Sequence, residues 1–303
     1  MGLREEWRDF VPDVSFELIP IKNLVSNQDY QRSLSTKQIQ KMVENFDLHQ
    51  INLVKVSRRD GVNLVMNGQH TIETVAAKSG SRDTPVWCMV YNDLSYEHEA
   101  DIFANQTKYT RALSSIEVFV AKVEAGYDEQ LMIKSLLESY DLKICSASHV
   151  NGTVCAIAAV EEIYEKYGFH TLDETIRLIL ATWEGESASF AGNILRAVAR
   201  VVYCYEDSLD HQMFAERLGN VSVKEIVRSA RERNNGILGY AETLITYYNR
   251  KTRGGNSLPW SKLYKVTRNE AETTEGQSLQ NTTSANTDNN KVTDMADSQC
   301  ANS

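Results

Sequence analysis

The chain has 303 residues, of which 42% are apolar, 9% aromatic and 24% charged, and its formal net charge is −9. This composition is typical of a folded globular protein and argues against a collagen, a disulfide scaffold or a wholly disordered chain. Its longest apolar runs, such as 154–160, are much shorter than a membrane span, so we expect no integral membrane protein. The charged opening residues lack the apolar stretch of a secretory signal, which predicts a cytoplasmic location.

The cysteines predict neither a zinc site nor a disulfide framework, because they are odd in number and never spaced as C-x-x-C. Cys145 and Cys155 are close enough in the sequence to meet, but small core side chains are the favoured interpretation. Cys300 is the exception, because it falls in a polar tail.

The negative charge gathers at the C-terminus. Residues 269–303 hold six acidic side chains and one lysine in a stretch rich in Asn, Thr, Ser and Gln. Such a segment buries too little apolar surface to offset the entropy of ordering, so we predict a disordered acidic tail. Before the tail we expect an α+β domain at 1–112, a helical domain at 113–253 and a basic arm at 254–268.

The N-terminal part predicts a strand followed by a capped helix. Residues 16–19 alternate as in a short strand and stop at Pro20. Ser35 and Gln38 have the spacing of a capping box, in which each side chain bonds to the other residue's backbone N–H. The apolar residues behind the box fall on one helical stripe: Ile39, Met42, Val43 and Phe46.

A hairpin and a strand–helix–strand unit come next. Residues 52–57 and 62–66 predict two strands, and Asp60-Gly61 supplies the positive φ that a tight hairpin needs. A helix over 71–78 and a strand over 85–91 complete the mixed sheet.

From Ser95 onward helical periodicity replaces the strand signals. Short Gly, Asn and Asp stretches separate the expected helices. After a helix capped at Ser95, these cover 115–124, 129–140, 153–167, 173–183, 193–205, 212–218, 223–233 and 239–248.

The stretch that carries most chemistry is Asn67-Gly68-Gln69-His70-Thr71, between the second hairpin strand and the next helix. A glycine turn before a helix points backbone N–H groups outward, and the helix dipole adds partial positive charge. The sequence therefore predicts a phosphate site, with Gln69 and His70 as donors and Thr71 as a hydroxyl. A purely local turn, with His70 packed or capping nearby, is the alternative.

Further polar residues support the phosphate interpretation. Arg32 precedes the capped helix and is placed to reach an anion. Asn105, Lys108 and Arg111 lie between two expected helices, where the cations suit phosphate and the amide suits a ribose or a metal. A solvated connection between helices would also explain them.

This order of motifs resembles the ParB/sulfiredoxin superfamily, and more narrowly the ParB-like nuclease-domain proteins of phages and mobile elements. The resemblance rests on the Ile-Pro-Ile strand at 19–21, Tyr30-Gln31-Arg32, the capped helix, the glycine turn and 105–108. It covers residues 16–126 and, more loosely, the helical half to 253. Members of the superfamily include CTP-dependent DNA clamps, ATP-using sulfiredoxins and nucleases.

The resemblance implies a nucleoside triphosphate, CTP or ATP with Mg²⁺, or a DNA phosphate at this site, and a homodimer. The chain departs from its relatives in informative ways. Gln69, His70 and Thr71 replace the arginine-bearing loop of the clamps, and Gln69 stands where sulfiredoxins carry their cysteine. Ala104 stands before Asn105 where the clamps carry a glutamate, and the loss of this carboxylate weakens metal binding for any hydrolysis.

The helical half carries a possible DNA-binding surface. Residues 214–228 have a helix, a glycine turn and a second helix, as in a helix-turn-helix, although any two packed helices would look the same. Arg250, Lys251 and Arg253 then form a basic stretch, with Trp260 and Tyr264 nearby to stack on bases. Other basic residues gather around it: Arg228, Arg231, Arg233, Lys262, Lys265 and Arg268.

Taken together, the sequence predicts a DNA-associated protein that binds nucleotide or DNA phosphate at the glycine turn. If it is an enzyme, the reaction is a Mg²⁺-dependent phosphoester or nucleotide hydrolysis, with His70 as acid or transition-state donor. No spaced histidine pair indicates a metal site of the protein's own. The alternative function is a catalytically inactive regulatory or protein-interaction module.

Overall fold

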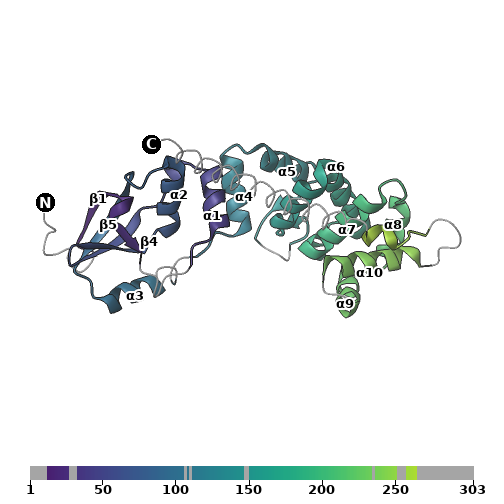
Figure 1. Cartoon of the computed structure of the whole chain (residues 1–303). Helices are drawn as coiled ribbons and strands as arrows, with labels where there is room; N and C mark the ends of the chain where they lie inside the picture. The colour runs from purple at the N-terminus through teal and green to yellow at the C-terminus, as the bar shows by residue number, and fades with distance from the viewer. Residues whose placement is uncertain are drawn as a thin grey trace, which may run out of the picture. The chain divides into compact units, whose positions relative to one another are not determined.

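A mixed five-stranded sheet organises the N-terminal part of the chain (Figure 1). The structure is a computed structural model and describes residues 12–26, 33–105, 108, 111–146, 150–233, 236–250 and 257–264. The chain divides between Ala112 and Leu113 into two units, and each is described by itself. The fold is α+β, as the sequence predicts.

The strands of the sheet follow the order β1-β5-β3-β4-β2. β1 pairs antiparallel with β5 and β3 antiparallel with β4, whereas β3 runs parallel to β5 and β2 parallel to β4. The strands are β1 (Val14–Pro20), β2 (Leu24–Ser26), β3 (Val54–Arg59), β4 (Val62–Asn67) and β5 (Pro85–Asn92).

The predicted hairpin between β3 and β4 is confirmed. Arg59 pairs with Val62 across the turn, and Asp60 and Gly61 both have positive φ, at 52° and 77°. Two consecutive left-handed residues give the turn a twist that matches that of the flanking strands.

Three helices accompany the sheet: α1 (Thr36–Glu44), α2 (Gln69–Ser79) and α3 (Tyr96–Asn105). The Ser35 hydroxyl accepts the N–H of Gln38 over 3.3 Å, so the predicted N-cap of α1 is confirmed. The reciprocal half of the predicted capping box is wrong, because the N–H of Ser35 donates to Nε2 of His70 and not to the Gln38 side chain. A buried cluster joins α2 to the sheet, in which Ile72 and Val75 meet Val54, Val56 and Cys88. Helix α2 therefore covers one face of the sheet, and α1 packs beside α2.

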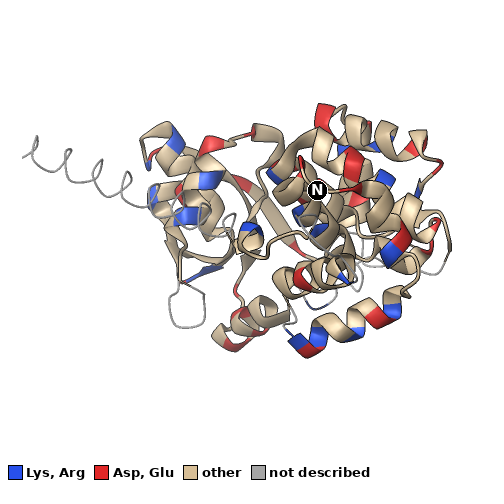
Figure 2. Ribbon diagram, turned by 90° about the vertical axis from the view of Figure 1, so that its right-hand side faces the viewer, with Lys and Arg blue, Asp and Glu red and all other residues tan. Residues whose placement is uncertain are grey.

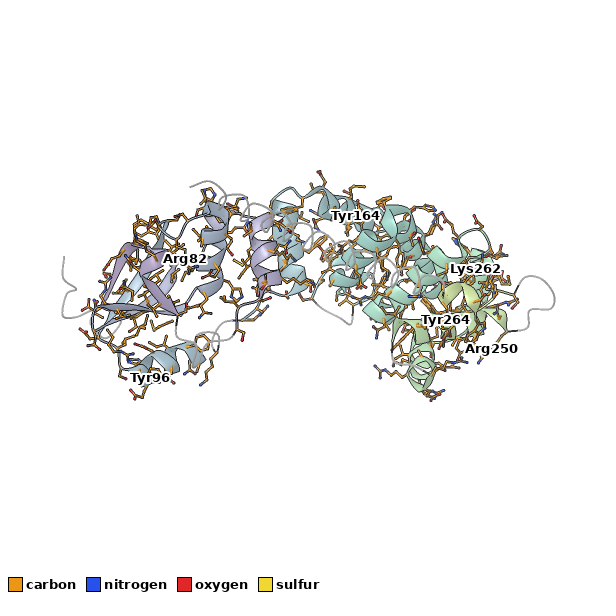
Figure 3. All side chains as sticks on the ribbon, viewed as in Figure 1. Arg82, Tyr96, Tyr164, Arg250, Lys262 and Tyr264 are labelled. Atoms are coloured by element: carbon orange, nitrogen blue, oxygen red, sulfur yellow. The ribbon has the colours of Figure 1, made fainter. Side chains whose placement is uncertain are left out.

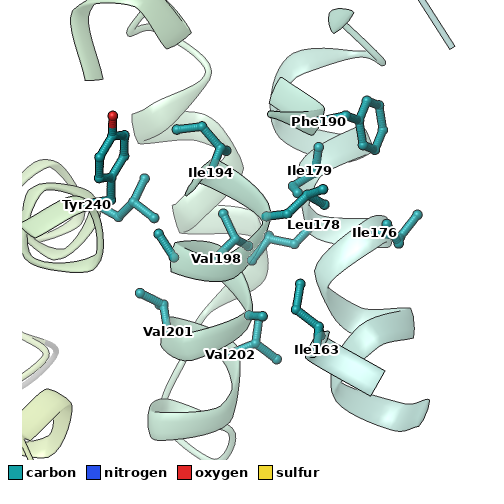
Figure 4. Close-up of a cluster of buried hydrophobic side chains, with 14 of the residues drawn as sticks. Ile163, Ile176, Leu178, Ile179, Phe190, Ile194, Val198, Val201, Val202 and Tyr240 are labelled. Carbon is teal, nitrogen blue, oxygen red and sulfur yellow. The ribbon is translucent and has the colours of Figure 1, made fainter. Parts of the chain in front are cut away.

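The second unit is a bundle of helices (Figure 1). Its core lies mainly between α6 and α7, where Ile163, Ile179, Ile194 and Val198 are fully buried or nearly so (Figure 4). The helices are α4 (Ser115–Glu124), α5 (Asp128–Ser139), α6 (Ile157–Trp183), α7 (Gly192–Tyr205), α8 (His211–Leu218), α9 (Val223–Arg233) and α10 (Ile237–Asn249).

Helix α6 spans two predicted helices. The chain kinks at Gly168, whose φ of 82° and ψ of 173° are not helical. The predicted start of this region is wrong, because Thr153–Val154 is a strand, β7, that pairs parallel with β6 (Lys143–Ile144). Helix α6 begins only at Ile157.

Residues 257–264 pack against the helical unit. Leu258 is 2% exposed and Leu263 fully buried. The side chain of Asn249 exchanges two 2.9 Å hydrogen bonds with the backbone of Leu258, and Arg200 donates to the carbonyl of Leu263 over 2.7 Å. Figure 3 labels Arg250, Lys262 and Tyr264, all of the helical unit.

The predicted acidic tail, 269–303, lies outside the described residues, as do 254–256 and 265–268 of the predicted basic arm. Within the described ranges, no helix combines the length and the apolar character needed to cross a membrane.

Candidate functional site

The glycine turn at the end of β4 strongly favours glycine at its centre. Gly68 has a φ of 108°, a conformation that side-chain-bearing residues rarely adopt. A Cβ at this position would lie 3.1 Å from Cγ2 and 3.2 Å from Cα of Val54, on β3. The turn therefore holds the start of α2 directly against the sheet.

Helix α2 begins without a side-chain cap. Gly68 has no side chain to offer, and the first intrahelical bond runs from the N–H of Ile72 to the carbonyl of Gly68. The N–H groups before Ile72 precede the intrahelical ladder. The first turn of α2 also contains no acidic residue, so no carboxylate of this turn offsets the positive end of the helix dipole.

His70 links the start of α2 to the start of α1. Its Nε2 accepts the backbone N–H of Ser35 over 3.3 Å. This bond requires an unprotonated Nε2, so the neutral ring carries its proton on Nδ1. His70 is half-buried, and its flanking residues Gln69 and Thr71 are each 8% exposed.

The two helices run side by side in the same direction. Ser35 meets His70 at their starts, the hydroxyl of Thr74 lies 3.8 Å from the sulfur of Met42 midway, and the Lys78 ammonium lies 5.8 Å from the Phe46 ring near their ends. Parallel helices bring their positive ends together, and α1 also has no acidic residue in its first turn. Two helix starts thus concentrate positive potential at His70.

A cleft of about 420 Å³ opens between α1 and α2. Thr71 reaches it from α2, and Gln38 and Lys41 reach it from α1. Asp47, which also lines the cleft, accepts the backbone N–H of His49 over 2.9 Å, and this bond holds the pKa of Asp47 below its usual range. The remaining lining residues are Met42, Asn45, Phe46, Gln50, Ile51, Asn52, Thr74 and Val75.

The structure therefore brings part of the predicted phosphate site together. Gly68, Gln69, His70 and Thr71 form the start of α2, and Asn67 is the exposed last residue of β4. Arg32 lies outside the described residues.

The later predicted residues have partners of their own. The amide of Asn105 donates to the carbonyl and to the carboxylate of Asp101, one turn earlier in α3, over 3.0 and 2.8 Å. Lys108 donates its backbone N–H to the carbonyl of Asn105, and its side chain and that of Arg111 are exposed. Asn105 would have to release Asp101 to reach a ligand.

The described residues contain no group of three or more His, Cys, Asp or Glu side chains placed to hold a metal ion.

Of the three predicted DNA-binding residues, the structure describes Arg250, which directly follows α10. Arg250 is exposed, and its guanidinium carbon lies 3.9 Å from the centroid of the Tyr247 ring. Lys251 and Arg253 lie outside the described ranges. Two further contacts involve the basic and aromatic residues singled out in the sequence: the Arg233 guanidinium carbon lies 5.5 Å from the centroid of the Trp260 ring, and the Tyr264 hydroxyl donates to Glu242.

Charges of both signs are interspersed over the molecule in Figure 2. Helix α9 shows this locally, because Glu225 and Glu232 alternate with its arginines. The helix packs mainly on α10, and the hydroxyl of Tyr247 donates to Glu225 over 3.0 Å. A DNA contact at this end of the unit would be local rather than a broad basic groove.

Sequence reasoning missed the cleft residues Lys41, Asp47, Gln50 and Asn52, and the contact of Ser35 with His70. The cap at Ser35 predicts the start of α1, but no local sequence pattern indicates that α1 and α2 lie parallel. That alignment depends on packing between segments about 35 residues apart in the chain.

Comparison with solved structures finds likeness to the C-terminally truncated chromosome-partitioning protein ParB from Caulobacter crescentus. The form complexed with CTP-gamma-S is 13% identical with a TM-score of 0.33, over 76% of this chain and 99% of that chain. The form complexed to the centromeric parS site is 14% identical with a TM-score of 0.20, over 71% and 99%. At these TM-scores the likeness is limited.

None of the curated proteins matches the chain. A family model does match, over residues 25–262, which include the glycine turn, the cleft and nearly all of the helical unit. The chain belongs to DUF6551, a family of unknown function.

Proposed function

We propose that this protein binds a phosphate-bearing ligand, a nucleoside triphosphate, where the first turns of α1 and α2 meet. The observation that carries the proposal is the parallel alignment of the two helices, fixed by the bond from Ser35 to His70. Two positive helix ends with no acidic residue in either first turn favour an anion at that place.

The adjoining cleft supplies room and donors for the rest of the nucleotide. Its volume of about 420 Å³ falls within the range of small-molecule sites. Thr71 and Gln38 line it near the helix starts, and Gln50 and Asn52 offer amides that can bond to a base. Arg32, Asn105, Lys108 and Arg111 are proposed to complete the phosphate contacts, as the motif resemblance implies.

The proposal places binding ahead of catalysis. The Nε2 of His70 accepts the N–H of Ser35, so His70 positions the two helix starts against each other. To act as a general acid, the ring would use Nδ1 or exchange its Ser35 bond for one to the ligand. CTP and ATP with Mg²⁺ are the ligands to test first.

The test is thermal melting of the full chain with CTP, ATP, GTP, UTP or inorganic triphosphate, each with and without Mg²⁺. A ligand that binds only the folded state must raise the melting temperature by mass action. The His70→Ala, Lys108→Ala double variant should lose the shift and keep its fold. His98→Ala, Lys134→Ala is the matched control, because it removes the same residue types from α3 and α5, away from the starts of α1 and α2.

A shift with one nucleotide, lost only in the first variant, supports the proposal and makes hydrolysis assays the next step. If no phosphate compound shifts the melting temperature, the proposal fails. The alternative of a regulatory or protein-interaction module then takes its place.

We further propose that the end of α10 contacts DNA through Arg250, Lys251 and Arg253. Fluorescence anisotropy with a labelled duplex, repeated over a salt series, tests this. Each lost phosphate contact should reduce the slope of log K against log salt by about 1. Replacing the three residues with alanine should flatten the slope, whereas Arg177→Ala should leave it unchanged.

The motif resemblance also implies a homodimer, which we propose for this protein. Sedimentation of the protein without DNA tests this proposal by measuring its mass in solution.

A further inference from the structure

Two cysteines lie directly opposite each other in the small β6–β7 ribbon. The N–H of Lys143 donates to the carbonyl of Gly152, which places Lys143 opposite Thr153. Two residues further on, the N–H of Cys145 donates to the carbonyl of Val154 over 3.4 Å. By the same parallel register, Cys145 lies opposite Cys155.

Opposite residues in neighbouring strands point to the same side, and their strands lie about 4.8 Å apart. That spacing falls within the Cα separation that a disulfide spans, roughly 4.4–6.8 Å. Both cysteines are half-buried thiols in the structure, so reagents can reach them.

The other described cysteines are not placed in this way. Cys88 is fully buried in the sheet of the first unit, and Cys204 lies on α7. Among the described cysteines, the strand register brings only Cys145 and Cys155 face to face.

We propose that Cys145 and Cys155 form a reversible disulfide when the protein meets a hydroperoxide. One thiolate attacks an oxygen of the peroxide and the O–O bond breaks, which leaves a sulfenic acid; the departing oxygen takes the proton that the thiol gave up and leaves as water from hydrogen peroxide, or as an alcohol from an organic hydroperoxide. The second thiol then attacks the sulfenic sulfur, the S–O bond breaks, and a water leaves as the S–S bond forms. The two sulfurs supply the two electrons, and two equivalents of a monothiol reductant restore the pair.

The position of the ribbon gives this bond a structural consequence. The ribbon joins α5 to α6, and the N–H of Gly152 donates to the carbonyl of Gly185 over 3.1 Å. Asn151 also accepts the N–H of Ser187, so the ribbon is tied to the turn between α6 and α7. Oxidation would close a loop of about ten residues and should raise the melting temperature of the helical unit by roughly 5 °C.

The experiment exposes the full chain to a modest excess of hydrogen peroxide and measures its peptides by mass spectrometry. Both cysteines fall in the tryptic peptide 144–166, which contains no internal Lys or Arg. The wild type should lose the mass of two hydrogen atoms from this peptide, regain it with dithiothreitol, and remain a monomer-sized band on a non-reducing gel.

Cys145→Ser and Cys155→Ser should each abolish this paired loss and the rise in melting temperature, and serine is small enough to keep the fold. Cys204→Ser is the matched control and should behave as the wild type does. The proposal is overturned if the wild-type peptide shows only added oxygen, if the disulfide joins another pair, or if either ribbon variant still loses two hydrogens.

Discussion

The backbone N–H of Ser35 and the Nε2 of His70 join the starts of two parallel helices. Ser35 also caps the start of α1 with its hydroxyl, so a single residue caps the first helix and contacts the second. Because neither first turn contains an acid, the junction gathers donors and positive potential without an internal counter-charge. Stability and ligand affinity should therefore respond in opposite directions to an added negative charge at this place.

Lys37→Glu tests that opposition. Lys37 is exposed in the first turn of α1, where a carboxylate interacts favourably with the helix dipole. We expect the free energy of unfolding to rise by about 0.5 kcal/mol at low salt. The same charge should weaken triphosphate binding. Chemical denaturation and a nucleotide titration measure the two effects.

Lys41→Glu is the matched control, because it makes the same change in the last turn of α1. There a carboxylate opposes the dipole, so unfolding should become easier by about 0.5 kcal/mol. If Lys37→Glu were destabilising as well, the junction would not be the positive site described above.

Gly68→Ala should damage the fold and the site together. The alanine would have to adopt a φ of 108° and place its Cβ 3.1 Å from Cγ2 of Val54. Left-handed strain and overpacking together should lower the free energy of unfolding by about 3 kcal/mol. Denaturation followed by circular dichroism measures the loss.

Gly80→Ala separates the two causes. Gly80 ends α2 with a φ of 70°, but nothing lies within 4 Å of a Cβ built there. Its cost should be the conformational strain alone, about 1 kcal/mol. Equal losses for the two variants would show that contact with Val54 is unimportant.

The sequence predicted those elements whose signals are local. The cap at Ser35 and the turn at Asp60-Gly61 each depend on a few neighbouring residues in the sequence, and both occur where expected. The two-residue strands β6 and β7 could not be found, because pairing across the chain, not propensity, makes Thr153–Val154 a strand. For the same reason the cleft between α1 and α2 was invisible: its lining depends on which way two distant helices align.

Acid should weaken the first unit through Glu17. Arg58 donates two hydrogen bonds to this carboxylate, the shorter of 2.6 Å, and they lower its pKa from 4.5 to about 2. The folded state therefore favours the charged form, and this contribution is complete above pH 4.5 and is lost as the pH falls toward 2. Glu17→Gln should flatten the loss of stability between these values, measured by calorimetry at several pH values.

The effect will be moderate, because the Glu17 side chain is 36% exposed and solvent screens the pair. Glu44→Gln is the control, since this exposed carboxylate accepts an amide bond from Gln40 and pairs with no arginine in the described ranges. If Glu17→Gln lost as much stability between pH 4.5 and 2 as the wild type does, another group would govern unfolding in acid.

Replacing Arg59 should cost more stability than replacing its ion-pair partner Glu99. The Glu99 side chain, in the first turn of α3, is fully buried and lies 3.5 Å from the Arg59 guanidinium, which is 32% exposed. Neither carboxylate oxygen has a hydrogen-bond partner among the described residues. Arg59→Met would strand a buried charge and should cost about 3 kcal/mol.

Glu99→Gln should cost less than about 1 kcal/mol, because the arginine left behind can be hydrated. Combining the two changes should recover part of the loss seen in Arg59→Met. Denaturation of the three variants forms a double-mutant cycle, and purely additive losses would rule out coupling between the pair.

Asn249→Ala should release the C-terminal segment from the helical unit. The Asn249 amide donates to the carbonyl of Leu258 and accepts its N–H, and both bonds measure 2.9 Å. Without them the backbone groups of Leu258, whose side chain is only 2% exposed, would lose their partners. We expect the free energy of unfolding to fall by about 2 kcal/mol and proteolysis within 257–264 to become faster.

Asn220→Ala is the control. It removes an exposed amide that donates to the carbonyl of Glu216, one turn earlier, and should change the free energy of unfolding by less than about 0.5 kcal/mol. Equal proteolysis in both variants would mean that the buried side chains of Leu258 and Leu263 hold the segment without the amide.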